Sequence, residues 1–188
     1  MLAVSFLLKR LDAHVDSEGA ALVFNAANDI DRILDELHNI SVELRPLALD
    51  HLGFVAALRS QAAVFEKTYG AEILFAGGLS CDRFDQALET QAYRICQEAI
   101  LNACKYSDTD RIYVTLEDSD GWLHVSVVDH GCGFNADEPE IKGSGCGMLG
   151  MQERANIIGA TLDVASGQDG TKVTLVAPMH ATEGKEGA

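Results

Sequence analysis

Three polar side chains share one stripe of a predicted helix, in the segment 93–106. Glu98 and Asn102 are four residues apart and Lys105 follows three residues later, so all three project from the same helix face. Their immediate neighbours are apolar, and polar groups beside a buried face are costly unless they have partners. An oxygen-liganded Mg²⁺ ion that carries phosphates would satisfy all three groups. A solvated helix face with one charge pair explains the same spacing.

A carboxylate stands at the end of a hydrophobic strand in the run Val127-Val128-Asp129-His130-Gly131-Cys132-Gly133. At the rim of a sheet, Asp129 can accept a hydrogen bond from an amino group. Gly131 and Gly133 allow the backbone to approach a ligand, because glycine has no Cβ. Many ordinary turns share this pattern, so a turn without a ligand is the alternative interpretation.

Four glycines lie in the stretch 143–150, which leads into a predicted helix. The free N–H groups and the positive dipole end of a helix N-terminus favour an anion such as phosphate. The Gly-Lys-Ser/Thr ending of a Walker A loop is missing, and no strand feeds directly into this stretch as in a dinucleotide fingerprint. A flexible glycine-rich loop is the alternative interpretation.

In this order, the three segments resemble the nucleotide-binding boxes of the histidine kinase catalytic domain. The helix segment resembles the N box, residues 129–133 resemble the G1 box, and residues 145–150 resemble the G2 box. Gly170-Thr171 is similar to the last nucleotide contact of that domain. Leu44-Arg45-Pro46 and Gly150-Met151-Gln152-Glu153-Arg154-Ala155 narrow the resemblance to the nitrate-sensor-like and desaturase-sensor-like subgroup of two-component sensor kinases.

The resemblance, which covers about residues 1–178, implies a site for ATP with Mg²⁺ and a role for each side chain. Asn102 would coordinate Mg²⁺, and Glu98 would position a metal-bound water or help to activate the accepting histidine. Lys105 would supply positive charge to a phosphate, and Asp129 would bind the adenine amino group. The implied nucleotide-binding residues are Asn102, Lys105, Asp129, Gly131, Gly133, Gly145, Gly147, Met148, Leu149, Gly150 and Thr171.

The N-terminal part of the chain predicts two helices, over about 2–15 and 20–45. In the second, apolar residues recur in alternating steps of four and three, which is typical of a coiled coil or a helical bundle. Two such helices cannot bury this apolar seam alone, so we expect a homodimer in which they complete a four-helix bundle.

From Asp50 onward the pattern is mixed. It predicts helices over about 52–69, 84–106 and 147–158 and strands over 71–76, 111–117, 122–128, 160–166 and 171–177. Asp118-Ser119-Asp120-Gly121 signals a hairpin between the second and third strands, and residues 167–170 join the last two strands into another. This order predicts an α+β fold in which helices cover one face of a sheet. The resemblance implies the mixed sheet of a Bergerat-type α/β sandwich. We therefore expect dimerisation helices over 1–46, an ATP-binding catalytic domain over 47–179 and a disordered tail over 180–188.

Composition limits the classes of partner. The 29 acidic residues outnumber the 14 basic ones for a net charge of -15, and such a surface repels nucleic acid.

No run of 18 apolar residues could span a membrane, and Met1–Leu8 lacks signal-peptide features, which predicts a cytoplasmic location. Membrane attachment of a longer protein is implied by the resemblance alone. The five cysteines form no CxxC pair, which favours reduced thiols over a zinc or disulfide framework.

The phospho-acceptor histidine of the subgroup lies in a Glu-Leu-His-Asp-like motif on the first bundle helix. Residues 2–15 resemble the part just after that motif, so the motif is expected to be missing, either by truncation or by natural loss. The run Glu36-Leu37-His38-Asn39 lies on the second helix and has Asn39 where the family has an acidic residue. We therefore interpret His38 as an ordinary bundle residue.

The function predicted from these features is that of the dimerisation and ATP-binding region of a sensor histidine kinase. Such a protein kinase transfers the γ-phosphate of ATP to a histidine, for relay to an aspartate of a response regulator receiver domain. This chain alone is not expected to autophosphorylate. The alternatives are a non-catalytic dimeric adaptor that binds a response regulator and an anti-sigma-type serine kinase. Intact nucleotide boxes argue against the adaptor, and the helical bundle argues against the serine kinase.

Overall fold

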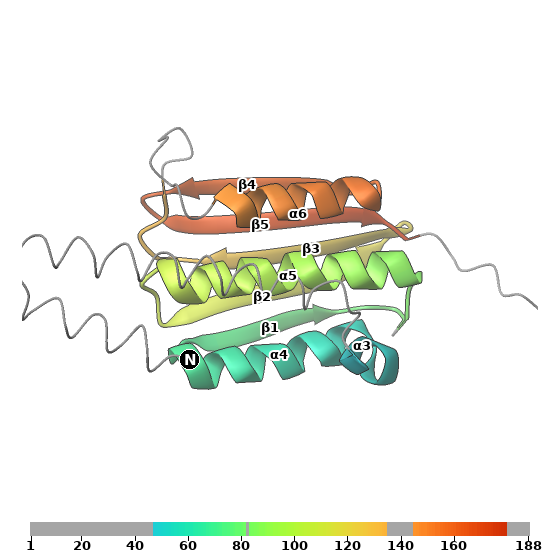
Figure 1. Cartoon of the computed structure of the whole chain (residues 1–188), viewed down its shortest axis with the longest axis horizontal. Helices are drawn as coiled ribbons and strands as arrows, with labels where there is room; N and C mark the ends of the chain where they lie inside the picture. Colours follow the sequence, from blue (N-terminus) through green and yellow to red (C-terminus); the bar gives the residue numbers. More distant parts are fainter. Residues whose placement is uncertain (1–46, 82, 135–144, 180–188) are drawn as a thin grey trace, which may run out of the picture. The chain divides into compact units, whose positions relative to one another are not determined.

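The centre of the fold is a five-stranded mixed sheet with the strand order β1-β2-β3-β5-β4 (Figure 1). β1 and β2 are parallel, and the other neighbouring strands are antiparallel. The strands are β1 (Glu72–Gly78), β2 (Arg111–Ser119), β3 (Trp122–Asp129), β4 (Thr161–Gly167) and β5 (Gly170–Pro178).

The computed structural model describes residues 47–81, 83–134 and 145–179. The predicted N-terminal helices with His38, their four-helix bundle, the domain boundary at residue 46 and the tail 180–188 lie outside these residues. Within the described ranges, no helix combines the length and the apolar character that crossing a bilayer requires.

The helices lie over one face of the sheet, as Figure 1 shows. They are α3 (Leu47–Leu52), α4 (Phe54–Tyr69), α5 (Gln86–Tyr106) and α6 (Gly145–Ile157). Buried side chains alternate along β2 and β3, because successive residues of a strand point to opposite faces. The buried apolar residues on these two strands are Ile112, Val114, Leu116, Leu123, Val125 and Val127. The predicted α+β fold with helices on one face of a mixed sheet is confirmed.

Several boundaries differ from those that the sequence pattern predicts, and two of them are informative. The helix expected over 52–69 is two helices, since Gly53 has a φ of 78° between α3 and α4 and such a left-handed residue interrupts a helix. β1 continues through Gly78, past the strand end expected at residue 76. The turn at Asp120-Gly121 is the expected hairpin, with φ values of 53° and 79° that are typical of a type I′ turn.

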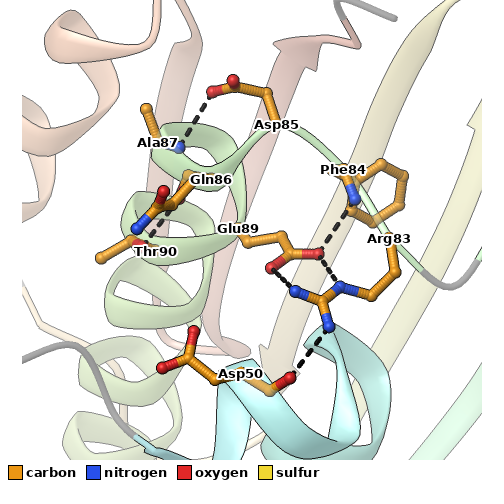
Figure 2. Close-up of polar contacts among 8 residues, drawn as sticks. All are labelled: Asp50, Arg83, Phe84, Asp85, Gln86, Ala87, Glu89 and Thr90. Atoms are coloured by element: carbon orange, nitrogen blue, oxygen red, sulfur yellow. Dashed lines mark hydrogen bonds and ion pairs between the residues drawn. The ribbon is translucent and has the colours of Figure 1, made fainter. Parts of the chain in front are cut away.

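The start of α5 is fixed by two carboxylates, as Figure 2 shows. Asp85 caps the helix by accepting hydrogen bonds from the backbone N–H groups of Ala87 at 2.9 Å and Leu88 at 3.4 Å. The fully buried Glu89 accepts from Arg83 Nε at 2.9 Å. Arg83 Nη1 also donates to a backbone carbonyl oxygen of α3 at 3.1 Å. This network fixes the first turn of the helix that carries Glu98 and Asn102 further along.

Candidate functional site

The carboxylate at the end of β3 is held by backbone N–H groups. Asp129 is 4% exposed, and its Oδ1 accepts hydrogen bonds from Gly131 N at 3.0 Å and Thr171 N at 3.2 Å. Among the described residues, no donor is paired with the second oxygen, Oδ2. This oxygen is not sealed from solvent, so a ligand can reach it. Asp129 is therefore oriented by the fold and retains one acceptor for a ligand.

The loop after β3 packs tightly on the protein's own backbone. A Cβ at Gly131 would overlap the Ser107 carbonyl, and one at Gly133 would overlap the Gly167 carbonyl. Cys132 N donates to Ser107 O at 2.8 Å between these two contacts. The sequence analysis explained both glycines by the approach of a ligand. In the structure, the close neighbour is the protein backbone, at the end of α5 and at the β4–β5 turn.

The polar stripe of α5 meets the first turn of α6. Asn102 Nδ2 donates to Glu98 Oε1 at 3.1 Å. A Cβ at Gly147 would overlap Glu98 Oε1 and would lie 3.6 Å from Asn102 Nδ2. The start of α6 therefore lies directly against these two side chains, and a Cβ at residue 147 would require the Glu98 carboxylate to turn away. Lys105 is exposed one turn further along α5.

The remaining predicted residues of α6 have different surroundings. Met148 is half-buried and packs against the core, whereas Leu149 is 61% exposed. A Cβ at Gly150 would meet no atom within 4 Å, so no close approach requires a glycine there. Gly145 is the first residue of α6.

The structure thus gathers the predicted residues into two groups. Glu98, Asn102 and Gly147 form one, and the other contains Asp129, Gly131, Gly133 and Thr171. Ser107, which caps the end of α5, contacts the second group, and Asn102 lies little more than one turn before it. The end of α5, the end of β3 and the start of α6 lie at the same edge of the fold in Figure 1.

Two serines of this region were missed in the sequence analysis. Buried Ser107 supplies the carbonyl on which the loop after β3 rests. Ser166 lies opposite Thr171 in the β4–β5 register, and its Oγ accepts from Phe134 N at 2.9 Å. The predicted hairpin already implied the pairing of residues 166 and 171, so a register count could have identified Ser166.

Burial keeps two of the cysteines protonated. Desolvation raises the pKa of Cys96 to about 12 and that of Cys104 to about 11, which suits their role as small apolar fillers. Cys132 is exposed, and its Sγ lies 3.3 Å from the Tyr106 carbonyl oxygen. The side chain of Cys146 lies outside the described residues.

Where the structure is described, His, Cys, Asp and Glu form no group of three that could hold a metal ion.

Comparison with known proteins identifies a family and several relatives. Residues 87–181 match the family of histidine kinase-, DNA gyrase B-, and HSP90-like ATPases. The chain is 43% identical over 150 residues to the oxygen sensor histidine kinase NreB of Staphylococcus carnosus. That match covers 79% of this chain and 43% of NreB, so the chain spans less than half the length of this relative.

Solved structures of low sequence identity share the fold. The histidine kinase domain of the blue-light activated histidine kinase EL346 from Erythrobacter litoralis matches with a TM-score of 0.60 at 20% identity. The match covers 95% of this chain and 93% of that domain. Full-length ShkA, crystallised in complex with AMPPNP, matches with a TM-score of 0.57 at 20% identity, over 95% of this chain and 43% of ShkA.

Proposed function

Because this chain belongs to the family of histidine kinase-, DNA gyrase B-, and HSP90-like ATPases, we propose that it binds ATP with Mg²⁺ for phosphoryl transfer to a histidine. The phosphoryl group would then pass to an aspartate of a response regulator receiver domain. One observation carries the proposal: the first turn of α6 lies against Glu98 and Asn102, at the end of α5 that also contacts the Asp129 loop.

The base of ATP is assigned to Asp129. Two backbone N–H groups orient this carboxylate through Oδ1, and Oδ2 has no donor among the described residues. An acceptor at this position suits an exocyclic amino group, which has protons to donate. The adenine amino group is the donor that we assign to Oδ2.

The phosphates are assigned to the start of α6. The first N–H groups of a helix have no partners within the helix, and together with the helix dipole they attract anions. In a chain with a net charge of -15, such local attraction is needed to hold a polyphosphate. We propose that Gly145, Gly147, Met148, Leu149 and Gly150 line the approach of the phosphates to these amides. Exposed Lys105 adds a positive charge.

Asn102 fits the role of magnesium ligand. Its Nδ2 donates to Glu98, which orients the amide and directs the opposite atom, Oδ1, away from that carboxylate. Amide oxygens are among the ligands that Mg²⁺ accepts. When bound, Mg²⁺ neutralises negative charge on the phosphates during transfer. Glu98, held by Asn102, is placed to position a metal-bound water or to accept a proton from the receiving histidine.

The similarity to NreB, of which the chain spans 43%, supports a proposal about the activities of a whole protein. We propose that the chain forms a homodimer through its N-terminal residues and phosphorylates a histidine presented by a separate segment. His38 is not the proposed acceptor. The response regulator is the proposed partner that receives the phosphoryl group.

Calorimetric titration with ATP tests the assignment. With Mg²⁺ present, Asn102→Ala is expected to bind ATP at least about 10-fold more weakly than wild type, which corresponds to about 1.4 kcal/mol. The difference should shrink in EDTA, because the lost group is a metal ligand. Asn156→Ala removes an exposed asparagine of α6 and serves as the matched control. Equal affinities of wild type and Asn102→Ala would refute the site. Acid-labile phosphate on a separate histidine-bearing segment would test transfer.

A further inference from the structure

The loop after β3 completes the end of α5. The last carbonyl groups of a helix have no partners within the helix, and Asp108, with a φ of 55°, turns the chain away directly after Ser107. Cys132 fills two of these positions: its N–H donates to Ser107 O at 2.8 Å, and its thiol lies 3.3 Å from Tyr106 O. The loop is therefore attached to the end of the helix through the Ser107 carbonyl.

Ser107 is held in place by its own turn of helix. Its N–H and its hydroxyl both donate to Ala103 O, at 3.2 Å and 2.6 Å, and the residue is 4% exposed. The Gly131 backbone passes so close that a Cβ at residue 131 would overlap Ser107 O and would lie 2.7 Å from Ser107 Cβ. Because Ser107 is buried and already packs against Gly131, a larger side chain at residue 107 is expected to displace this part of the loop.

Displacement of Gly131 reaches the candidate site in one step. The Gly131 N–H is one of the two donors that orient Asp129 Oδ1, at a distance of 3.0 Å. The direction of Oδ2 follows from these bonds, because both oxygens belong to one rigid carboxylate. The helix that ends at Ser107 also carries Asn102, the proposed magnesium ligand. Ser107 therefore joins the carboxylate assigned to the base to the helix assigned to the metal.

We propose that Ser107 is a positioning residue that sets the orientation of Asp129 relative to Asn102, through its small size and its carbonyl oxygen, and thereby supports recognition of the 6-amino group of adenine. The proposal rests on the proposed function, in which Asp129 binds that group. Ser107 acts through Gly131 and makes no contact of its own with the nucleotide. If Ser107 served the fold alone, enlarging its side chain would weaken binding of every nucleotide by the same factor.

The test compares ATP with purine riboside triphosphate, which has a hydrogen atom in place of the 6-amino group. In calorimetric titrations with Mg²⁺ present, wild type is expected to prefer ATP by about 10-fold, since a hydrogen bond to a charged group is lost. In Ser107→Val this preference should fall to about 3-fold or less, while the affinity for purine riboside triphosphate changes by less than about 2-fold. Ser107→Ala keeps the small size and the carbonyl oxygen, so it should retain the full preference.

An NMR measurement follows the same contact without nucleotide. The Gly131 amide proton is expected downfield in the wild-type spectrum, because its N–H donates to a carboxylate. This resonance should move upfield in Ser107→Val and should not move upfield in Ser107→Ala. If Ser107→Val does not fold, Ser107→Thr takes its place in both measurements, since it adds one methyl group and keeps the hydroxyl.

The outcomes separate this inference from the proposed function. If wild type binds no ATP, the proposed function fails and the inference fails with it. If wild type binds ATP but the enlarged variant keeps the full preference or leaves the Gly131 resonance in place, the inference fails while the proposed function stands. The same holds if Ser107→Ala loses the preference, because the hydroxyl and not the size of the side chain would then be the group that acts.

Discussion

Two buried carboxylates of this domain, Glu89 and Asp129, distribute their hydrogen bonds differently. Glu89 is fully buried, and both of its oxygens are bonded: Oε1 accepts from Arg83 Nε at 2.9 Å and Phe84 N at 3.0 Å, and Oε2 accepts from Arg83 Nη2 at 3.4 Å. Asp129 has both of its bonds on Oδ1. A carboxylate that the protein satisfies on both oxygens serves the fold, whereas one with a spare oxygen suits a ligand.

The two carboxylates also occupy opposite ends of α5. Glu89 lies in its first turn, where Figure 2 shows Arg83 joining it to the backbone of α3. Asp129 lies near its last turn, because the loop after β3 contacts Ser107. The helix is thus fixed at one end by internal bonds and is placed next to the candidate site at the other. The same replacement, carboxylate to amide, should consequently affect stability at one end and ligand binding at the other.

Glu89→Gln is expected to have the largest effect, a loss of about 3 kcal/mol in the free energy of unfolding. The change keeps the shape of the side chain, but it removes the negative charge opposite Arg83. It also turns an amide N–H₂ group toward an N–H group that donates to Glu89 in the wild type. Urea denaturation measures the loss, and Glu153→Gln on the exposed face of α6 is the control, expected to change stability by less than about 0.5 kcal/mol.

The ATP affinity of folded Glu89→Gln should equal that of wild type. If Glu89→Gln lost more binding free energy for ATP than free energy of unfolding, the first turn of α5 would take part in binding. The division between the two ends of the helix would then be wrong.

Asp129→Asn should produce the reverse result. The amide oxygen can still accept from Gly131 N and Thr171 N, so the free energy of unfolding should change by no more than about 1 kcal/mol. The amide N–H₂ group takes the place of Oδ2 and faces the adenine amino group, donor against donor. ATP affinity should fall by about 100-fold, or about 2.7 kcal/mol.

Fluorescence titration with an ATP analogue and urea denaturation of the same protein measure both quantities. Asp163→Asn, on an exposed position of β4, is the matched control and should change neither. If Asp129→Asn unfolded the domain but kept its affinity, Asp129 would belong with Glu89 as a structural carboxylate.

The contrast also explains which features the sequence could predict. Local patterns predict α5, its polar stripe and the hairpin at Asp120-Gly121, because the residues involved lie within a few positions of each other. The pairing of Asp129 with Thr171 spans 42 residues and depends on the β3–β5 register, and the resemblance alone suggested a common site. The role of Ser107 depends on such long-range packing too, and no local pattern distinguishes it from a surface serine, whereas Ser166 could have been found from the register of the predicted β4–β5 hairpin.

Burial of Glu89 is the least predictable of these features. Its partner Arg83 is only six residues away, but the Glu89 side chain is fully buried whereas the Arg83 side chain is 53% exposed. A glutamate in the first turn of a helix ordinarily faces solvent, where it favours the helix dipole. The first-turn position alone would favour an exposed glutamate, whereas Glu89 is buried and bonded to Arg83 and to Phe84 N.

A third carboxylate separates the effect of bonding from the effect of burial. Asp118 is bonded on both oxygens, as Glu89 is, but it lies at the surface, where Ser80 donates from its N–H to Oδ1 at 2.7 Å and from its hydroxyl to Oδ2. The bond from the Ser80 hydroxyl, followed by that from the Ser80 backbone N–H, lowers the pKa of Asp118 below its ordinary value. Because solvent competes for these bonds, we expect the smallest of the three effects here.

Ser80→Ala removes the hydroxyl bond and should lower stability slightly at pH 7. A carboxyl whose pKa is lower in the folded state than in the unfolded chain stabilises the fold above its unfolded pKa, and this contribution disappears as the pH falls through the folded value. The difference in thermal midpoint between wild type and Ser80→Ala should therefore shrink from pH 7 to pH 2, while Ser60→Ala on exposed α4 shows no such trend. A difference as large as that of Glu89→Gln would mean that bonding on both oxygens, and not burial, determines how much a carboxylate contributes to this fold.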